Sequence, residues 1–289
     1  MKIPIIVIVG ETASGKSSLA LDLARDFDGE IINADSWAVY KNFNIGTAKP
    51  SFPDRKKIKH HLLDVTDPEK GFSAVEFKRL ALEAIREIHA NGRIPILVGG
   101  TGLYVDCLVY DYSFLPVSSK DDRHYFESLS LDELRGMCKD LNYDTRDIDM
   151  NNKRRVIRLL ENKGVRPTSK AFRENTLTIG IRVEPKELEK NITTRIDKMF
   201  KEGLLDEVKS LHNKYGWDIE PMKGIGYREF RDYFEGKIDM QELISRINLD
   251  TIKLVKKQRT WFKRNKSIQW HTDRDEIVDT VTTFVNKFN

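Results

Sequence analysis

The segment Gly10-Glu11-Thr12-Ala13-Ser14-Gly15-Lys16-Ser17 matches the phosphate-binding pattern G-x-x-x-x-G-K-[ST]. An apolar, β-branched run precedes it at residues 3–9, and a segment with helical periodicity follows it at residues 17–24. In this strand–loop–helix setting, glycines let backbone N–H groups surround a di- or triphosphate at the helix N-terminus. We therefore predict a P-loop in which Ser17 also holds Mg²⁺. The predicted diphosphate-binding residues are Gly10, Thr12, Ala13, Ser14, Gly15, Lys16 and Ser17.

Two further apolar segments predict strands of the same sheet. Residues 30–34 end at Asp35-Ser36, and residues 94–98 end at Gly99-Gly100-Thr101-Gly102. Between them, residues 74–90 are amphipathic and stop at Asn91-Gly92, which is typical of a helix end. Short apolar strands that alternate with helices indicate a parallel sheet covered on both faces. The predicted fold class is α/β, with a P-loop NTPase-like parallel sheet core, an inserted helical lobe and C-terminal helices.

The remainder of the chain is predicted to be mostly helical. Residues 116–175 show no strand pattern and are polar and charged, as expected of a lobe inserted into the core. Residues 178–183 predict a strand that returns to the sheet. After it we predict only helices, at residues 186–215, 227–235, 240–264 and 275–288. The expected domains are a P-loop core at 1–115, the inserted lobe at 116–175, and the return strand with C-terminal helices packing on the core at 176–289.

Composition excludes several classes of protein. The 289 residues are 39% hydrophobic and 33% charged, which is typical of a soluble globular protein. No apolar run approaches the roughly 20 residues that span a bilayer, and the apolar start has no signal-peptide cleavage site, so we expect a cytoplasmic protein and no membrane. Cys107 and Cys138 lack metal-ligand spacing and are predicted to have packing roles. The adjacent His60 and His61 would point apart, which argues against a metal site there.

The net charge of +4 is concentrated in two basic runs. Residues 151–182 contain nine basic residues and two acids, Glu161 and Glu174; the basic residues are Lys153, Arg154, Arg155, Arg158, Lys163, Arg166, Lys170, Arg173 and Arg182. Residues 251–270 contain no acid and interleave three aromatic side chains; the basic residues there are Lys253, Lys256, Lys257, Arg259, Lys263, Arg264 and Lys266. One such run is typical of a solvated helix face. Two of them beside a phosphate-binding loop favour a nucleic-acid backbone as partner.

Asp35 and Thr101 each follow a predicted strand, where ligands of open parallel sheets bind. We predict that Asp35 is functional and that Thr101 donates a hydrogen bond to the bound phosphate. Two alternatives remain for these residues: Asp35 caps the turn that follows it, and Thr101 is a structural residue of a tight turn. A small-metabolite kinase would also place an acid here, to hold its acceptor hydroxyl.

Together these motifs resemble those of the tRNA dimethylallyltransferases, also called tRNA isopentenyltransferases. The similarity spans nearly the whole chain. Besides the P-loop it includes residues 35–40, 44–50, 60–68, 99–104, 154–161, 195–204, 224–229 and 257–262. Glu11 departs from the family pattern, which usually has Pro, and Asn191 stands where Arg is common. The segment 116–151 is shorter than is usual in the family, and we expect this difference to affect how the anticodon arm is bound.

The resemblance implies transfer of a dimethylallyl group from dimethylallyl diphosphate to N6 of adenosine 37, beside the anticodon of tRNA, with release of diphosphate. The adenine amino group is a poor nucleophile that becomes acidic on attack, so a carboxylate base is needed, and Asp35 is the predicted base. The loop amides, Lys16, Mg²⁺ and Thr101 are expected to stabilise the departing diphosphate, and the resemblance adds Arg195. The adenine must be splayed out of its stacked loop to reach this site.

The resemblance also implies which residues contact tRNA. They are Asp35, Ser36, Trp37, Ala38, Thr101, Arg123, Arg154, Arg155, Arg158, Lys223, Gly226, Tyr227, Arg228, Lys257 and Arg259. We expect a monomer. Three other functions remain open: a P-loop kinase, which would consume ATP; an enzyme that prenylates free adenine nucleotides, for which the basic C-terminal helices would have no purpose; and a non-enzymatic GTPase-like RNA-binding module, which the absence of a recognisable guanine-specifying motif disfavours.

Overall fold

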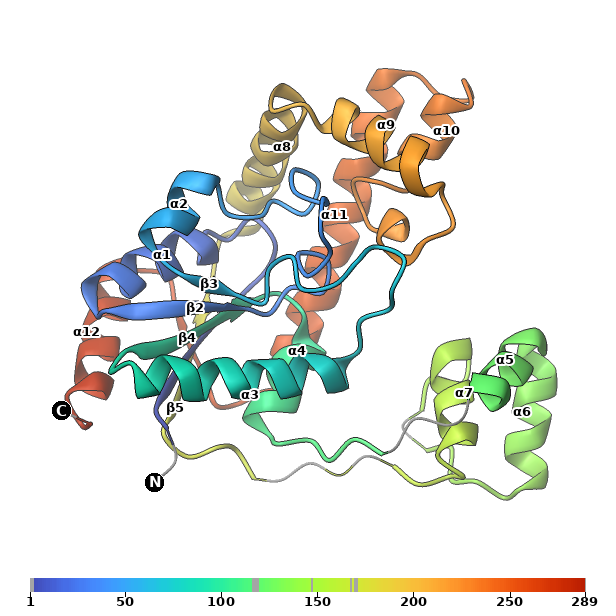
Figure 1. The fold of residues 1–289 in the computed structure, drawn as a ribbon, viewed down its shortest axis with the longest axis horizontal. Coiled ribbons are helices and arrows are strands. Elements are labelled where there is room, and N and C mark those ends of the chain that lie inside the picture. Colours follow the sequence, from blue (N-terminus) through green and yellow to red (C-terminus); the bar gives the residue numbers. More distant parts are fainter. Residues whose placement is uncertain (1–2, 116–119, 147, 167, 169–170, 289) are drawn as a thin grey trace. The chain divides into compact units, whose positions relative to one another are not determined.

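The computed structural model describes residues 3–115, 120–146, 148–166, 168 and 171–288 (Figure 1). The chain divides into two compact units. We call residues 1–109 with 172–289 the core unit and residues 110–171 the insert unit. Pro116, the predicted start of the inserted lobe, and Lys170 of the first basic run lie outside the described residues.

A six-stranded sheet with the strand order β3-β2-β4-β1-β5-β6 forms the centre of the core unit. Every neighbouring pair of strands is parallel. The strands are β1 (Ile5–Val9), β2 (Gly29–Asn33), β3 (His60–His61), β4 (Ile94–Gly99), β5 (Thr176–Ile181) and β6 (Ile268–His271). Strands β1 and β2 are buried along their whole length, as expected where helices cover both faces. The predicted α/β class with a parallel sheet is confirmed.

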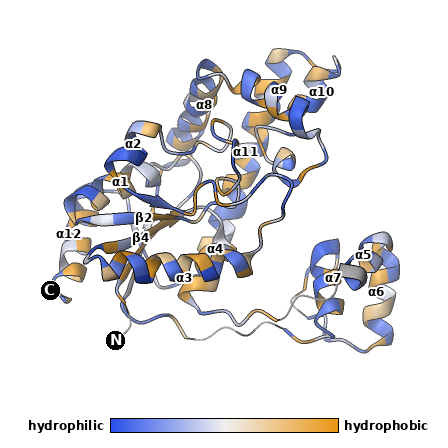
Figure 2. Ribbon diagram, in the orientation of Figure 1, coloured by the Kyte–Doolittle hydropathy of each residue, from blue (hydrophilic) through white to orange (hydrophobic). Residues whose placement is uncertain are grey.

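Helices pack on both faces of this sheet (Figure 1). On one face, α1 (Lys16–Asp26) and α12 (Arg274–Val285) share a buried cluster with Ile6 and Ile8. Because side chains alternate along a strand, Ile5 and Val7 point to the other face, which α3 (Ala74–Ala90) and α4 (Gly102–Val109) cover. Hydrophobic and hydrophilic residues alternate along α3 (Figure 2), and its buried residues, Phe77, Ala81, Ala84, Ile85 and Ile88, recur every three to four positions, as on one face of a helix. The carboxyl ends of the strands stay accessible between these layers.

The predicted helix at residues 74–90 is confirmed at both ends. Ser73 accepts a hydrogen bond from the backbone N–H of Glu76, and the Glu76 side chain accepts one from the N–H of Ser73, which completes a capping box. The helix ends at Asn91, and Gly92 follows with a left-handed φ of 73°. Capping is local chemistry, so the sequence alone places these ends.

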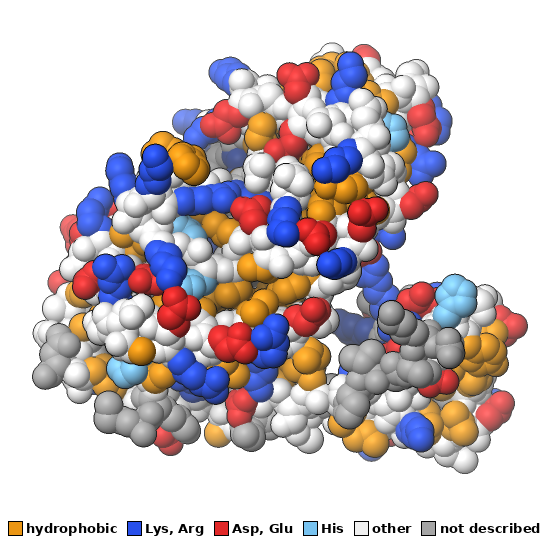
Figure 3. Space-filling model, in the orientation of Figure 1, with side chains coloured by type: hydrophobic (Ala, Val, Ile, Leu, Met, Phe, Trp, Pro, Cys, Tyr) orange, Lys and Arg blue, Asp and Glu red, His pale blue; other side chains and the backbone are white. Residues whose placement is uncertain are grey.

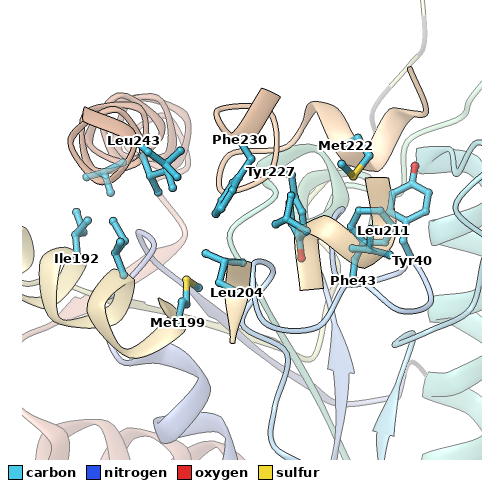
Figure 4. Close-up of a cluster of buried hydrophobic side chains, with 14 of the residues drawn as sticks. Tyr40, Phe43, Ile192, Met199, Leu204, Leu211, Met222, Tyr227, Phe230 and Leu243 are labelled. Atoms are coloured by element: carbon cyan, nitrogen blue, oxygen red, sulfur yellow. The ribbon is translucent and has the colours of Figure 1, made fainter. Parts of the chain in front are cut away.

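The C-terminal half of the core unit adds a helical layer beside the sheet. It contains α8 (Pro185–Lys201), α9 (Leu204–Tyr215), the short 3₁₀ helix η1 (Glu220–Lys223), α10 (Phe230–Phe234) and α11 (Met240–Phe262). These helices bury a second apolar cluster in which the Tyr227 ring lies near Phe43 and Phe230 (Figure 4). Phe43 comes from the long segment between β2 and the short helix α2 (Phe52–Lys57). The cluster therefore joins the segment that follows β2 to the C-terminal helices.

The prediction that only helices follow residue 183 is wrong for residues 268–271. They form β6, which pairs in parallel with β5 at the edge of the sheet, with Thr178 opposite Ile268. The burial pattern explains why the sequence does not predict this strand, since Ile268 is buried and Gln269 is exposed. Four residues with one solvent face carry a weak strand pattern, and pairing with β5 gives them their conformation.

The insert unit is helical. Its helices are α5 (Lys120–Ser128), α6 (Leu131–Asp140) and α7 (Lys153–Glu161), and they enclose a small cluster of their own that includes Leu134, Cys138 and Leu160. Cys107 is buried in the core unit, and both cysteines are free thiols. Within the described residues, no helix has the length and apolar character to cross a membrane.

Candidate active site

The P-loop joins β1 to α1 and wraps tightly at its centre. Ala13 and Gly15 have left-handed φ values of 65° and 87°, and Gly15 immediately precedes the first turn of α1. The ammonium of Lys16 donates a hydrogen bond to the carbonyl oxygen of Glu11 over 2.9 Å, so the lysine folds back over the loop. The N-cap residue Gly15 has no side chain with which to cap the first-turn N–H groups of α1, which leaves them available to an anion.

A cavity lies against this loop at the carboxyl ends of the strands. Its polar lining includes Thr12, Lys16, Ser17, Asp35 and Arg195. A second cavity is lined mainly by apolar side chains of the C-terminal helices, and it shares Thr12, Asp35, Thr47 and Arg195 with the first. The two cavities therefore adjoin where the segment after β2 meets α8. Asp35 and Arg195 therefore border both cavities, and a ligand in either cavity would lie next to them.

The charged groups where the two cavities adjoin favour the binding of an anion. The pKa of Lys16 is lowered to about 8, first by burial and then by the charge of the nearby Arg195, while Asp35 and Glu11 act in the opposite direction. Burial also lowers the pKa of Arg195, against the attraction of Asp35. Two desolvated cations thus flank one carboxylate, and an anionic ligand would relieve their unfavourable burial.

Asp35 is held in place by local hydrogen bonds. Its Oδ1 accepts the N–H of Trp37 over 2.8 Å, and its own N–H donates to Asn33 Oδ1 over 3.2 Å. Asn33 Nδ2 also donates to the carbonyl oxygen of Leu62, which ties this turn to the next segment. Asp35 therefore both caps its turn and lines the two cavities, so the two interpretations of this residue are compatible.

Thr101 is connected to the turn that carries Asp35 by hydrogen bonds to Ser36. Its Oγ1 accepts the N–H of Ser36 over 3.0 Å and donates to the Ser36 hydroxyl over 3.2 Å. Among the described residues, the linings of the two cavities include neither Thr101 nor Ser36. In this structure Thr101 fastens the turn after β4 to the turn after β2.

Sequence reasoning did not single out Glu207, on the first turn of α9. Its carboxylate accepts the N–H groups of Asn44, Ile45 and Gly46 over 2.8–3.1 Å, and the Tyr227 hydroxyl over 2.7 Å. This carboxylate holds the segment 44–50, which forms a wall of both cavities. An acid in the first turn of a helix, here after Gly203, is typical of a residue that interacts with the helix dipole. This local pattern does not predict that Glu207 binds residues far away in the sequence.

His60 and His61 do point apart. His61 Nε2 lies 2.6 Å from Glu30 Oε2, whereas His60 Nδ1 lies 2.8 Å from the Ile58 carbonyl oxygen and His60 lines the first cavity. Burial lowers the pKa of His60. Across the part of the chain that the structure describes, no group of three His, Cys, Asp or Glu side chains could hold a metal ion.

The residues expected to contact tRNA in the core unit are divided between several places. Trp37, Lys223, Gly226, Tyr227 and Arg228 line the second cavity. The Tyr227 side chain is only 1% exposed and belongs to the apolar core, although its edge reaches that cavity. Ala38 lines the first cavity. Lys257 and Arg259 are exposed on α11, where Arg259 Nε lies 2.5 Å from Glu11 Oε1.

The other expected tRNA contacts, Arg123, Arg154, Arg155 and Arg158, belong to the insert unit. Arg123 and Arg158 both form ion pairs with the buried Glu161, each over 3.2 Å. Arg154 and Arg155 are exposed on α7. On the face drawn in Figure 3, basic and acidic side chains are interspersed over the core unit, so this face presents no continuous basic surface.

The fold and the site define a P-loop α/β protein with a buried, cation-rich cavity beside a carboxylate. The IPP transferase family matches residues 38–265. The chain belongs to this family. The tRNA dimethylallyltransferase of Roseiflexus sp. (strain RS-1) is 39% identical to it over 99% of both chains. That of Anoxybacillus flavithermus is 36% identical over 95% of this chain and 92% of its own.

Solved structures agree with this assignment. The full-length tRNA isopentenylpyrophosphate transferase of Bacillus halodurans has a TM-score of 0.76 and 34% identity, covering 99% of this chain and 96% of its own. A eukaryotic dimethylallyltransferase described as acting on tRNA has a TM-score of 0.77 and 27% identity, covering 94% of this chain and 75% of its own. The P-loop-like α/β fold is therefore shared with transferases of this family.

Proposed function

We propose that this protein transfers a dimethylallyl group from dimethylallyl diphosphate to N6 of adenosine 37 in tRNA, beside the anticodon, and releases diphosphate. The observation that carries the proposal is the convergence of Lys16, Arg195 and Asp35 on one cavity against the P-loop. Two cations suit a diphosphate leaving group, and one carboxylate suits the amino group that attacks. The relatives named tRNA dimethylallyltransferase support the same activity.

The P-loop is the proposed diphosphate site. Its members Gly10, Thr12, Ala13, Ser14, Gly15, Lys16 and Ser17 surround the uncapped N-terminus of α1. The Ser14 hydroxyl is buried and has no hydrogen-bond partner among the described residues, as expected of a donor that awaits a phosphate oxygen. When the bond from the allylic carbon to diphosphate breaks, negative charge grows on the departing oxygen, and Lys16 and Arg195 lie on the cavity to stabilise it.

Mg²⁺ fits this arrangement if diphosphate supplies most of its ligands. The described residues offer no carboxylate cluster for a metal, while Ser17 lines the cavity beside Lys16. Magnesium is commonly held by substrate phosphates, water and one or two protein oxygens, so the Ser17 hydroxyl is the proposed protein ligand. When bound there, the ion would neutralise charge on the diphosphate.

Asp35 is the proposed general base. As N6 of adenine forms its bond to the allylic carbon, one amino proton becomes acidic and passes to the Asp35 carboxylate. The hydrogen bond from the Trp37 N–H fixes Oδ1 of Asp35, so the carboxylate keeps its position as the charges change. Thr101 supports this arrangement through Ser36, which follows Asp35 directly.

The adenine reaches Asp35 only if it leaves the stacked anticodon loop. Trp37 and Arg228 at the second cavity, the arginines of the insert unit, and Lys257 with Arg259 on α11 are the proposed tRNA contacts. We propose that the enzyme acts as a monomer in the cytoplasm, where unmodified tRNA is found.

The test is an assay with tRNA carrying A37, dimethylallyl diphosphate and Mg²⁺, without ATP, followed by mass analysis of the nucleosides. The expected product is adenosine with one added dimethylallyl group. Asp35→Asn, which keeps the side-chain shape, should lower kcat by roughly 10²- to 10⁴-fold while it changes the affinity for prenyl diphosphate little. Asp26→Asn, at the exposed end of α1, is the matched control. Absence of product without ATP, or equal rates for Asp35→Asn and wild type, would overturn the proposal.

A further inference from the structure

The side-chain amide of Gln258 is buried, although the residues on either side of it on α11 are exposed. Its side chain is 8% exposed, whereas Lys257 and Arg259 on either side of it lie at the surface. A buried amide must find partners for both its donor and its acceptor, or it destabilises the fold. The partners of Gln258 therefore indicate what this turn of α11 does.

Both partners belong to the candidate active site. Gln258 Oε1 accepts the N–H of Thr12 in the P-loop over 2.8 Å. Gln258 Nε2 donates to the carbonyl oxygen of Gly100, in the turn after β4, over 3.1 Å. The orientation of the amide follows from chemistry, because a backbone N–H only donates and a carbonyl oxygen only accepts. The approach is also close, since a Cβ on Gly100 would lie 2.3 Å from Nε2.

These two bonds join the two halves of the site. Thr12 lines both cavities on the diphosphate side. Gly100 precedes Thr101, which holds Ser36 and so the turn that carries Asp35. A single amide thus spans from the phosphate loop to the segment that supports the carboxylate. Neither a carboxylate nor an apolar side chain can donate and accept in the same way.

We propose that Gln258 is a positioning residue for prenyl transfer, whose amide sets the spacing between the P-loop and the turn that supports Asp35. This inference rests on the proposed function. A shift of about 1 Å between reacting groups can cost roughly 10²-fold in rate, so loss of this bridge should lower kcat without weakening tRNA binding.

Variants of Gln258 should remain folded because α11 has other attachments nearby. Trp261 Nε1 donates to Asp106 Oδ2 on α4 over 2.8 Å, and Phe262 is buried. The charged groups around the amide are Glu11 and Lys16 at the P-loop, Arg259 on α11, and Asp106 on α4. All variants share these groups. The pH dependence that these groups give to the rate is therefore common to all variants, and it cancels in the ratio of two rates.

The experiment compares Gln258→Met, Gln258→Glu and the control Gln241→Glu, which makes the same charge change at the exposed start of α11. We expect Gln258→Met to lower kcat by roughly 10- to 100-fold, with a KM for tRNA within about twofold of wild type. The control should match wild type at every pH.

Gln258→Glu provides the readout that a purely structural role would not give. We expect burial and the facing Gly100 carbonyl to raise the pKa of a carboxyl at this position, against the Thr12 N–H, which favours the charged form, and only the protonated form can donate to that carbonyl. Its rate relative to Gln258→Met should therefore rise as the pH falls from about 8.5 to about 6. The inference is overturned if this ratio is independent of pH, or if both variants keep the wild-type kcat.

The same variants separate this inference from the proposed function. If the wild-type protein transfers no dimethylallyl group, the proposed function fails. The role of Gln258 is then decided by calorimetry with inorganic diphosphate and Mg²⁺. Gln258→Glu must weaken that binding at high pH and Gln241→Glu must not, and equal affinities would overturn the inference.

Discussion

The Tyr227 hydroxyl donates a hydrogen bond to Glu207 Oε1 over 2.7 Å, and the same carboxylate accepts three consecutive backbone N–H groups from residues 44–46. Residues 44–46 lie about 160 positions away from Glu207 in the sequence. One side chain of the helical layer thereby fixes a wall of both cavities. This contact makes the helices behind the site part of its architecture.

Glu207→Ala should destabilise the protein and open this wall. It removes the acceptor of four donors, so we expect a loss of roughly 2–4 kcal/mol in the free energy of unfolding. Tyr227→Phe removes one of these bonds and should cost about 1 kcal/mol. Urea unfolding followed by circular dichroism measures both. Glu202→Ala, which breaks only an exposed ion pair with Lys198, is the control. A stability for Glu207→Ala equal to that control would contradict the assigned role.

Gly46→Ala should be harmful for a steric reason. A Cβ at this position would lie 2.4 Å from Cζ of Tyr227, whose ring is packed in the apolar cluster (Figure 4). The segment 44–50 must then move away from Glu207, so we expect loss of stability together with a higher KM for prenyl diphosphate. Gly71→Ala is the control because a Cβ there meets no atom within 4 Å among the described residues beyond its chain neighbours. Identical melting temperatures for the two variants would argue against this packing.

Binding of prenyl diphosphate should depend on pH through Lys16. In the free protein its pKa is about 8, so the ammonium is charged below that pH and neutral above it. A bound anion raises this pKa, so affinity should be constant below about pH 8 and fall by up to tenfold per unit above it. Calorimetry in buffers of different ionisation enthalpy should then show proton uptake at pH 8.5. Lys16→Met should bind prenyl diphosphate weakly, and its affinity should no longer depend on pH in this range. If the pH dependence persists in Lys16→Met, another group causes it.

The salt dependence of tRNA binding tests the basic surface of α11. If Lys257 neutralises one phosphate, Lys257→Gln should reduce the slope of log K against log salt by about 1 unit. Lys237→Gln, which alters an exposed lysine paired with Glu235, should leave the slope unchanged. Filter binding between about 50 and 200 mM salt measures both. A slope for Lys257→Gln that matches wild type would remove this residue from the tRNA surface.

The elements that were predicted correctly depend on neighbours in the sequence. The P-loop is eight consecutive residues, and the helix at 74–90 carries its capping box and its Asn91-Gly92 end within it. Strand β1 is a continuous apolar run, and β2 and β4 contain shorter ones, because helices cover the sheet on both faces. Local hydrogen bonding and the period of apolar residues are visible without any knowledge of the fold.

Folding was needed to reveal contacts between residues far apart in the chain. Strand β6 exists because β5 pairs with it, Glu207 receives donors from residues 44–46, and Gln258 bridges Thr12 and Gly100, with 246 positions separating it from Thr12. The backbone of β6 and the polar side chains of Glu207 and Gln258 all need hydrogen-bond partners when they are buried. Those partners lie far away in the sequence, so no short motif contains them. The amino-acid order therefore named the phosphate loop and its family, while the three-dimensional packing assigned the residues that hold the loop against Asp35.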